Sequence, residues 1–294
     1  GIMQRIVTVF AWLMRKTMGT SGSESLAAAA NIFVGQTEAL LLVKPFVATM
    51  TRSELTAVMV GGFATVAGGV MALYVLFLQD IPGIAGHLAT ASVLSAPAAL
   101  AIAKILVPET EESKTQGAIS LNIEQTDTNA IEALARGATE GLKLAANVAA
   151  MLIAFVAIVA MVNANMLSLF DVSFAEVLGW VFAPLAFVMG VPWEESPIVG
   201  QLLGEKLVLT ELIAYSHLQE MLSQEVPVLS ERSSIIASYA LCGFANFASI
   251  GIQIGGIGGI APERRRDLAE LGIRAMIGGT LAACLTATIA GMLL

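Results

Sequence analysis

Two segments of the chain place carboxylates and other hydrogen-bonding side chains inside otherwise apolar sequence. The first is Gln36-Thr37-Glu38, within residues 31–45, and the second contains Glu211. At membrane depth such groups are costly, and they persist where protein buries them or a water-filled cavity bathes them. The apolar flanks of both segments are shorter than the about 20 helical residues that cross a bilayer. Both segments are therefore predicted to be re-entrant hairpins whose polar tips face a solvated binding site.

The composition of the chain indicates an integral membrane protein. Of its 294 residues, 56% are hydrophobic and 13% are charged, whereas about a quarter of the residues of soluble domains are charged. The apolar blocks are long and rich in Gly and Ala, without the alternation of outer-membrane strands, so an α-helical bundle is expected. The net charge of −8 says little about partners, because in a membrane protein the placement of Lys and Arg is more informative than their sum. The apolar composition makes the lipid bilayer the expected surrounding, and no nucleic-acid partner is expected because no basic patch is present.

The elements that must hold the two polar segments occur in the same order twice. Each copy has an interfacial or re-entrant helix, a polar-tipped hairpin, a helix broken by glycines and a plain final helix. The expected elements are residues 1–19, 26–51, 53–79 and 84–107 in the first copy, and 171–191, 192–221, 231–260 and 263–294 in the second.

Three domains are predicted from this pattern. Residues 1–107 form the first repeat and residues 171–294 form the second, inverted repeat. Residues 108–170 between them are expected to be a loop, a surface helix over residues 128–143 and a scaffold transmembrane helix over residues 144–166.

The distribution of positive charge predicts that the two copies have opposite orientations. The turn at residues 79–84 contains no Lys or Arg, whereas the equivalent turn at residues 262–267 contains Arg264, Arg265 and Arg266. Because Lys and Arg favour the cytoplasmic side of a membrane, the two turns are expected on opposite sides. Inverted repeats with discontinuous helices are the architecture of secondary transporters, whose substrate binds between the repeats.

Four strings of the sequence resemble the concentrative nucleoside transporter family. They are NIFVGQTEA (residues 31–39), GGFATVAGG (61–69), SAPAALAIAK (95–104) and SYALCGFANFASIGIQIGG (238–256). The resemblance covers essentially the whole chain, although family members carry further N-terminal scaffold helices, so an N-terminally truncated bacterial member is expected. The implied fold is an all-α membrane protein in which an inverted repeat of re-entrant hairpins and Gly-broken transmembrane helices makes an elevator-type transport domain with a partial scaffold. The implied function is Na⁺- or H⁺-coupled nucleoside uptake by a homotrimer that crosses the inner membrane several times.

The resemblance also implies roles for individual residues. The nucleobase would be recognised by Gln36, Thr37 and Glu38, with Val70 packed on its ring. Ribose and pocket contacts would come from Glu211, Phe244, Asn246 and Ser249, and the cation would be held by the side chains of Asn31 and Thr65 and the carbonyls of Val34 and Val66. These residue types suit a nucleoside, which is neutral and carries donors and acceptors on its base and hydroxyls on its sugar. No catalytic residue is expected, and no cofactor apart from the coupling cation.

Several alternatives stay open at this point. Glu38 or Glu211 can simply pair with Lys44 or Lys206 and hold helices together, or can act as the acid or base of an intramembrane enzyme. The enzyme is not expected, because no H-E-x-x-H or G-x-S-x-G motif is present. A third alternative is an inactive remnant of a transporter. The sequence does not distinguish Na⁺ from H⁺ as the coupling cation, because both need oxygen ligands and carboxylates. The preference for purine or pyrimidine is also open, since Leu40 and Thr210 stand where family hairpins commonly carry Pro and Asn.

Overall fold

The structure is a computed structural model that describes residues 2–116, 128–224 and 228–294, without the side chains of residues 2–4 and of parts of 140–156. Helices account for the regular structure of this described part, which contains no strand. The chain forms two compact units, the first from residues 1–119 and 175–294 and the second from residues 120–174. Part of the predicted loop after residue 107, residues 117–127, lies outside the described residues. The predicted domain boundaries stay predictions.

The second unit contains helix α7 (Ala130–Phe170), which runs without interruption through both the predicted surface helix and the predicted scaffold helix. Asn129 caps it, because its side chain accepts hydrogen bonds from the backbone N–H groups of Ile131 and Glu132. The run contains no proline, so the local sequence offers no strong reason to stop between the two predicted elements.

The first repeat begins with the helices α1 (Ile2–Met18), α2 (Gly22–Asn31) and α3 (Glu38–Val47). Helices α2 and α3 pack against each other and form the first hairpin, whose tip is residues 32–37. A capping box begins α2, in which Ser21 and Glu24 each accept a hydrogen bond from the other's backbone N–H. The predicted hairpin is therefore present, as is a helix at residues 2–18, whose interfacial position stays a prediction.

The first broken helix consists of α4 (Arg52–Ala64) and α5 (Gly68–Phe77). Between them Thr65 and Ala67 have extended backbone, with ψ angles of 162° and 137°, so the chain leaves the helix and re-enters it. The long helix α6 (Ile84–Leu106) then completes the first repeat. The break falls between the glycine pairs, as predicted.

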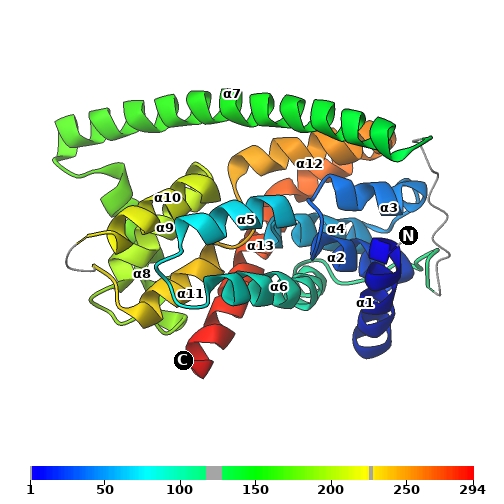
Figure 1. The fold of residues 1–294 in the computed structure, drawn as a ribbon, viewed down its shortest axis with the longest axis horizontal. Helices are drawn as coiled ribbons and strands as arrows, with labels where there is room; N and C mark the ends of the chain where they lie inside the picture. The colour runs from blue at the N-terminus through cyan, green and yellow to red at the C-terminus, as the bar shows by residue number, and fades with distance from the viewer. Residues whose placement is uncertain (1, 117–127, 225–227) are drawn as a thin grey trace. The chain divides into compact units, whose positions relative to one another are not determined.

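The second repeat has the same order of elements. It contains α8 (Phe174–Val188), the second hairpin α9 (Ser196–Val208) and α10 (Glu211–Leu222), the second broken helix α11 (Glu231–Leu241) and α12 (Phe247–Ile260), the 3₁₀ turn η1 (Pro262–Arg264) and α13 (Arg265–Leu293). In Figure 1 the second hairpin lies at one end of the first unit and the first hairpin at the other, with α5 between them.

Polar contacts show that the two broken helices run in opposite directions. At the start of α4, Arg52 forms ion pairs with Asp267 at 2.9 Å and Glu270 at 3.0 Å, near the start of α13. At the start of α11, Arg232 Nη2 donates to the carbonyl of Gly291, near the end of α13. Because α4 and α11 begin at opposite ends of the same helix, the inversion predicted from the charge pattern is confirmed.

The two breaks meet at Gly243. This residue has a φ of 107°, which L-residues with a side chain rarely adopt, and a Cβ here would lie 2.7 Å from the carbonyl oxygen of Phe63. Only glycine therefore allows the unwound part of the second broken helix to rest against the end of α4. Helix α13 packs beside both, against α4, α6, α11 and α12.

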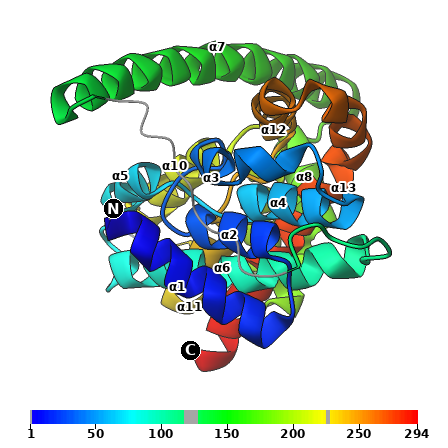
Figure 2. The same cartoon turned by 90° about the vertical axis from the view of Figure 1, so that its right-hand side faces the viewer.

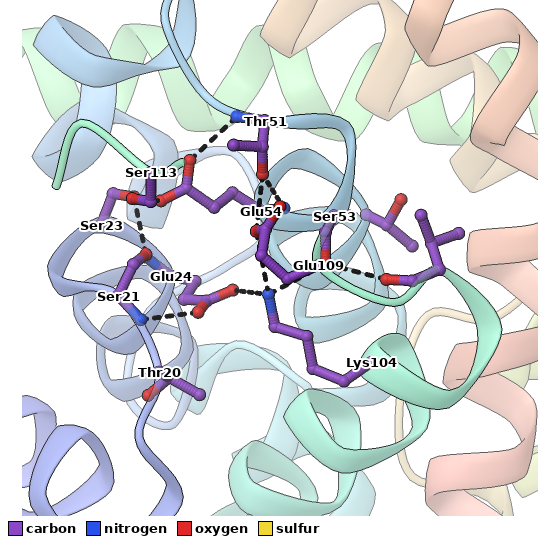
Figure 3. A network of polar contacts seen from close by, with 12 residues as sticks. Thr20, Ser21, Ser23, Glu24, Thr51, Ser53, Glu54, Lys104, Glu109 and Ser113 are labelled. Atoms are coloured by element: carbon purple, nitrogen blue, oxygen red, sulfur yellow. Dashed lines mark hydrogen bonds and ion pairs between the residues drawn. The ribbon is translucent and has the colours of Figure 1, made fainter. Parts of the chain in front are cut away.

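A buried polar network joins the base of the first hairpin to the start of α4 (Figure 3). The Glu54 carboxylate, fully buried, accepts hydrogen bonds from the hydroxyls of Ser23, Ser113 and Thr115. Beside it, the Lys104 ammonium pairs with Glu24 at 2.8 Å. Residues 107–115 thus lie across the beginnings of α2 and α4 and fix one to the other. Figure 2 shows α2, α4 and α6 beside one another, and each of the three packs against the other two.

Three helical stretches of the described part are long and apolar enough to cross a membrane: Arg52–Phe77, Ile84–Leu106 and Pro262–Leu293. A fourth results if Ala157–Phe170 and Phe174–Val188 are counted as one span. The all-α membrane fold with inverted repeats is therefore confirmed.

Candidate functional site

Glu211 is the centre of one group of polar contacts. It is the first residue of α10, is 5% exposed, and accepts hydrogen bonds from the Tyr74 hydroxyl at 2.9 Å and from Asn246 Nδ2 at 3.0 Å. The three residues come from the second hairpin, the first broken helix and the break of the second. Each carboxylate oxygen has two lone-pair sites, so two donors leave acceptor capacity for hydroxyl groups.

The side chain of Asn246 forms hydrogen bonds with two neighbours. Its Oδ1 accepts a hydrogen bond from the backbone N–H of Ser249 at 2.8 Å and so caps α12, while its Nδ2 donates to Glu211. An aspartate can cap a helix equally well but offers no donor to a carboxylate. The predicted residues Glu211, Asn246 and Ser249 are thus brought together, and all three are buried.

Gln36, at the tip of the first hairpin, also reaches α12. Its Oε1 accepts a hydrogen bond from Gln253 Nε2 at 2.9 Å, and the same Nε2 donates to the carbonyl of Met59 at 3.0 Å. Gln253 was not predicted as a site residue, although a lone amide in the apolar run of α12 was a signal. Its Oε1 is buried without a hydrogen-bond partner in the described part of the chain.

Both hairpin tips therefore contact one face of one helix. Asn246, Ser249 and Gln253 follow each other at helical spacings of three and four residues, which places them on the same face of α12. At about 1.5 Å per residue, the seven residues from Asn246 to Gln253 cover about 10 Å. The polar tips converge as predicted, on groups that α12 holds at two positions about 10 Å apart.

Thr37 and Glu38, which follow Gln36 at the end of the tip and the start of α3, have different surroundings from Gln36. Glu38 is exposed, and its carboxylate folds back over Gly35 and accepts a hydrogen bond from the Thr37 hydroxyl at 3.1 Å. The structure therefore separates the buried amide from an accessible hydroxyl and carboxylate.

Two predicted apolar residues pack against the same core as the second hairpin. Val70 and Phe244 are half-buried and lie against the hydrophobic cluster that contains Tyr74 and Tyr215. Tyr74 and Tyr215 stack with ring centroids 4.3 Å apart. Apolar surface is thus available beside the Glu211 group.

Two of the four predicted cation ligands, Asn31 and Thr65, lie where the first hairpin meets the end of α4. Asn31 is 2% exposed, and its Oδ1 has no hydrogen-bond partner among the described residues. Thr65 Oγ1 donates to the carbonyl of Gly61 at 2.8 Å, and a Cβ at Gly61 would lie 3.2 Å from Asn31 Nδ2. The tip also touches the break through the N–H of Gly68, which donates to the carbonyl of Phe33. An unsatisfied buried oxygen beside an unwound helix suits a hard cation.

The two lysines considered as partners of the site carboxylates have other surroundings. Lys44 is exposed. Lys206 is buried, and its ammonium donates to the carbonyls of Ala240 at 3.0 Å and Cys242 at 3.2 Å. Within the described residues neither lysine lies within 4.0 Å of a carboxylate oxygen of Glu38 or Glu211, and Lys206 acts on Glu211 electrostatically from a longer distance.

Two family models match the chain. One, described as "Na+ dependent nucleoside transporter C-terminus", matches residues 87–291, and the other, described as "Nucleoside recognition", matches residues 1–80. Together they cover both repeats and confirm the resemblance seen in the four strings.

Named relatives agree with the family models. Solute carrier family 28 member 3 of Mus musculus is 45% identical over the whole chain, and the chain spans 44% of its length. Sodium/nucleoside cotransporter 1 of Rattus norvegicus is 43% identical, with 47% of its length covered. An uncharacterized transporter, YutK of Bacillus subtilis (strain 168), is 45% identical, with 99% of the chain and 72% of the relative covered. The chain thus spans less than half of the two mammalian relatives.

Solved structures share the fold. The transporter CNTnw in an inward-facing, substrate-bound state has 46% sequence identity and a TM-score of 0.91, covering 99% of this chain and 70% of that one. A doubly substituted CNTnw in an outward-facing state has 44% identity and a TM-score of 0.89, with coverages of 99% and 69%.

Proposed function

The chain belongs to the Na⁺-dependent nucleoside transporter family, and we propose that it forms the substrate- and cation-binding part of a cation-coupled nucleoside importer of the plasma membrane. The observation that carries the proposal is the convergence of both hairpin tips on one face of α12. The contacts come from opposite repeats, and an alternating-access transporter binds its substrate between such repeats.

The substrate is proposed to lie along α12 with its sugar at Asn246 and its base towards Gln253. Glu211 keeps free lone pairs, and a carboxylate accepts hydrogen bonds from vicinal hydroxyls more strongly than a neutral group does. Ser249 is the second ribose contact, and Phe244 lines the site. At the other end, Gln36, Thr37 and Glu38 present amide, hydroxyl and carboxylate groups for the edge of a base, with Val70 against its ring.

Gln253 is proposed as an additional base contact. Its amide orientation is fixed, since Nε2 faces two acceptor oxygens, and this leaves Oε1 as a buried acceptor. A base with an N–H donor would satisfy it.

The coupling cation is proposed to be Na⁺, bound by the Asn31 and Thr65 side chains and the Val34 and Val66 carbonyls. The support is the unpartnered Oδ1 of Asn31 and the naming of a relative as a sodium/nucleoside cotransporter. Proton coupling is the alternative. The assembly is proposed to be a homotrimer in which the transport domain moves elevator-fashion, a cycle for which CNTnw offers inward-facing, intermediate and outward-facing states.

Counterflow in proteoliposomes tests the function. Proteoliposomes that contain the protein and are loaded with unlabelled nucleoside should take up intact radiolabelled nucleoside in Na⁺. They should lose this uptake when choline replaces Na⁺ at constant pH. Uptake that persists in choline and follows the pH gradient would favour H⁺. Altered radiolabelled product would indicate an enzyme, and nucleoside binding without any uptake would indicate a remnant.

The Glu211→Gln variant tests the ribose assignment. The amide nearly preserves the shape of the side chain but loses its charge, so uptake should fall by at least about tenfold while the protein still folds. Full uptake in this variant would remove Glu211 from the site.

A further inference from the structure

Lys206, on the first arm of the second hairpin, has no role in the proposed function. Its side chain is 1% exposed, and its ammonium donates to the carbonyl oxygens of Ala240 at 3.0 Å and Cys242 at 3.2 Å. Both carbonyls lie where α11 ends and the second helix is broken. A buried ammonium is costly without partners, so these two contacts hold the charge in place.

The first repeat has an oxygen-rich position at the corresponding place. Asn31 ends α2, the first arm of the first hairpin, and lies beside the end of α4, where Thr65 begins the break. Lys206 lies two residues before Val208, the last residue of α9, which is the first arm of the second hairpin, and it contacts the break that begins at Cys242. In both repeats a side chain from the first arm thus lies beside the end of the first half of the broken helix, Asn31 next to Gly61 in the last turn of α4 and Lys206 next to the carbonyls of Ala240 and Cys242.

The two positions differ in charge. Asn31 is neutral and offers an unpartnered oxygen, which suits a free cation. Lys206 is itself cationic, and its ammonium donates hydrogen bonds to the carbonyl oxygens at the break. Carbonyls at the C-terminal end of a half-helix carry partial negative charge, so a cation at either break is stabilised.

We propose that the ammonium of Lys206 is a built-in cation, which takes in the second repeat the place that a free Na⁺ takes in the first. The inference rests on the proposed cation site at Asn31. It predicts that the chain binds a single exchangeable cation and that removal of Lys206 creates a second, empty position. Lys206 is accordingly a positioning residue, which holds the second hairpin against the second break throughout the cycle.

Two substitutions separate this role from ordinary packing. Lys206→Ala removes the charge and leaves room for an ion, whereas Lys206→Met removes the charge and fills the space. The protein is placed in lipid nanodiscs, and Tm is measured without nucleoside in NaCl and in choline chloride at equal ionic strength. The quantity compared is the rise in Tm that Na⁺ causes, because only an ion that binds the folded state raises Tm in this way.

In choline chloride both variants should have a lower Tm than the wild type. In Lys206→Ala the rise caused by Na⁺ should exceed that of the wild type, since a second ion now binds the folded state. In Lys206→Met it should equal that of the wild type. A rise in Lys206→Ala no larger than in Lys206→Met would overturn the built-in cation.

The rise in Tm that Na⁺ causes in the wild type tests the proposed Na⁺ site separately. If Na⁺ does not raise its Tm, the site at Asn31 fails, and the built-in cation then stands or falls on whether Lys206→Ala alone responds. Should Lys206→Ala not fold, Asn31→Lys tests the same equivalence from the other side. This variant should keep the wild-type Tm in choline and lose the response to Na⁺, and a retained response would count against the equivalence.

Discussion

The hydroxyl of Tyr74, in the first broken helix, donates to the carboxylate of Glu211, at the tip of the second hairpin, across 2.9 Å. The two residues lie 137 positions apart in the chain and belong to opposite repeats. The proposed ribose carboxylate is therefore oriented by a residue of the other repeat, and the position of the second hairpin is coupled to that of α5.

Replacing Tyr74 by Phe should weaken nucleoside binding while sparing analogues without ribose hydroxyls. The ring can still stack on Tyr215, but Glu211 loses one of its two donors and no longer holds its orientation. Loss of about 1.4 kcal/mol corresponds to about a tenfold weaker Kd. Calorimetric titration with a nucleoside and its 2′,3′-dideoxy analogue measures the difference. Tyr215→Phe is the matched control, because that hydroxyl donates to the carbonyl of Ser238. Equal losses for both ligands would contradict the orienting role.

Replacing Gln253 by Leu should change the discrimination between bases and lower stability. The variant leaves Gln36 and the carbonyl of Met59 without their donor, at a cost of about 1–3 kcal/mol for each buried group. Competition of different nucleosides for uptake, together with Tm, measures both effects. Gln201→Leu serves as control, since this amide on α9 bonds Glu205 instead. An unchanged order of preference among bases would show that Gln253 has only a structural role.

Replacing Gly243 by Ala should destabilise the protein. The residue has a positive φ, and an added methyl group would meet the carbonyl of Phe63. Backbone strain of this kind costs about 1–3 kcal/mol, so Tm should fall by several degrees. The control is Gly251→Ala in α12, where nothing lies within 4 Å of an added Cβ and Ala is the better helix former. Similar Tm values for the two variants would argue against a contact between the breaks.

Glu195, at the start of the second hairpin, should make stability depend on pH. Burial raises the pKa of Glu195, but hydrogen bonds from Ser233 and Ser230 outweigh it and hold that pKa below its ordinary value of 4.5. Because the folded state lowers the pKa, the stabilisation is present above pH 4.5 and is lost as the pH falls through the folded value. Tm measured from neutral to acidic pH should fall less steeply in Glu195→Gln. The neighbouring Glu194→Gln, at an exposed position, should retain the wild-type profile.

Much of the fold is readable from the sequence because the bilayer permits few structures. Apolar arms that are too short to cross leave a hairpin as the solution at Gln36, and the glycines around Thr65 give a helix that must break. The three arginines after α12 indicate orientation for the same reason, since charge cannot cross lipid freely. These features depend on local sequence and on the membrane alone.

The contacts that complete the site depend on tertiary structure instead. Gln253 meets Gln36 across 217 positions, and no spacing within α12 reveals which tip its amide faces. Tyr74 reads as an ordinary aromatic residue of an apolar helix until α10 is placed beside it. The partners of Lys206 are backbone carbonyls of a break, which the sequence does not distinguish from other backbone.

The buried network around Glu54 gives the two hairpins different surroundings at their bases. Three hydroxyls and the ion pair between Lys104 and Glu24 hold the base of the first hairpin, whereas Glu195, which is partly open to solvent, bonds the base of the second to Ser230. Solvent therefore reaches the polar contact at the base of the second hairpin but not the carboxylate at the base of the first. The rest of the second hairpin is held separately, by Lys206 and by the partners of Glu211.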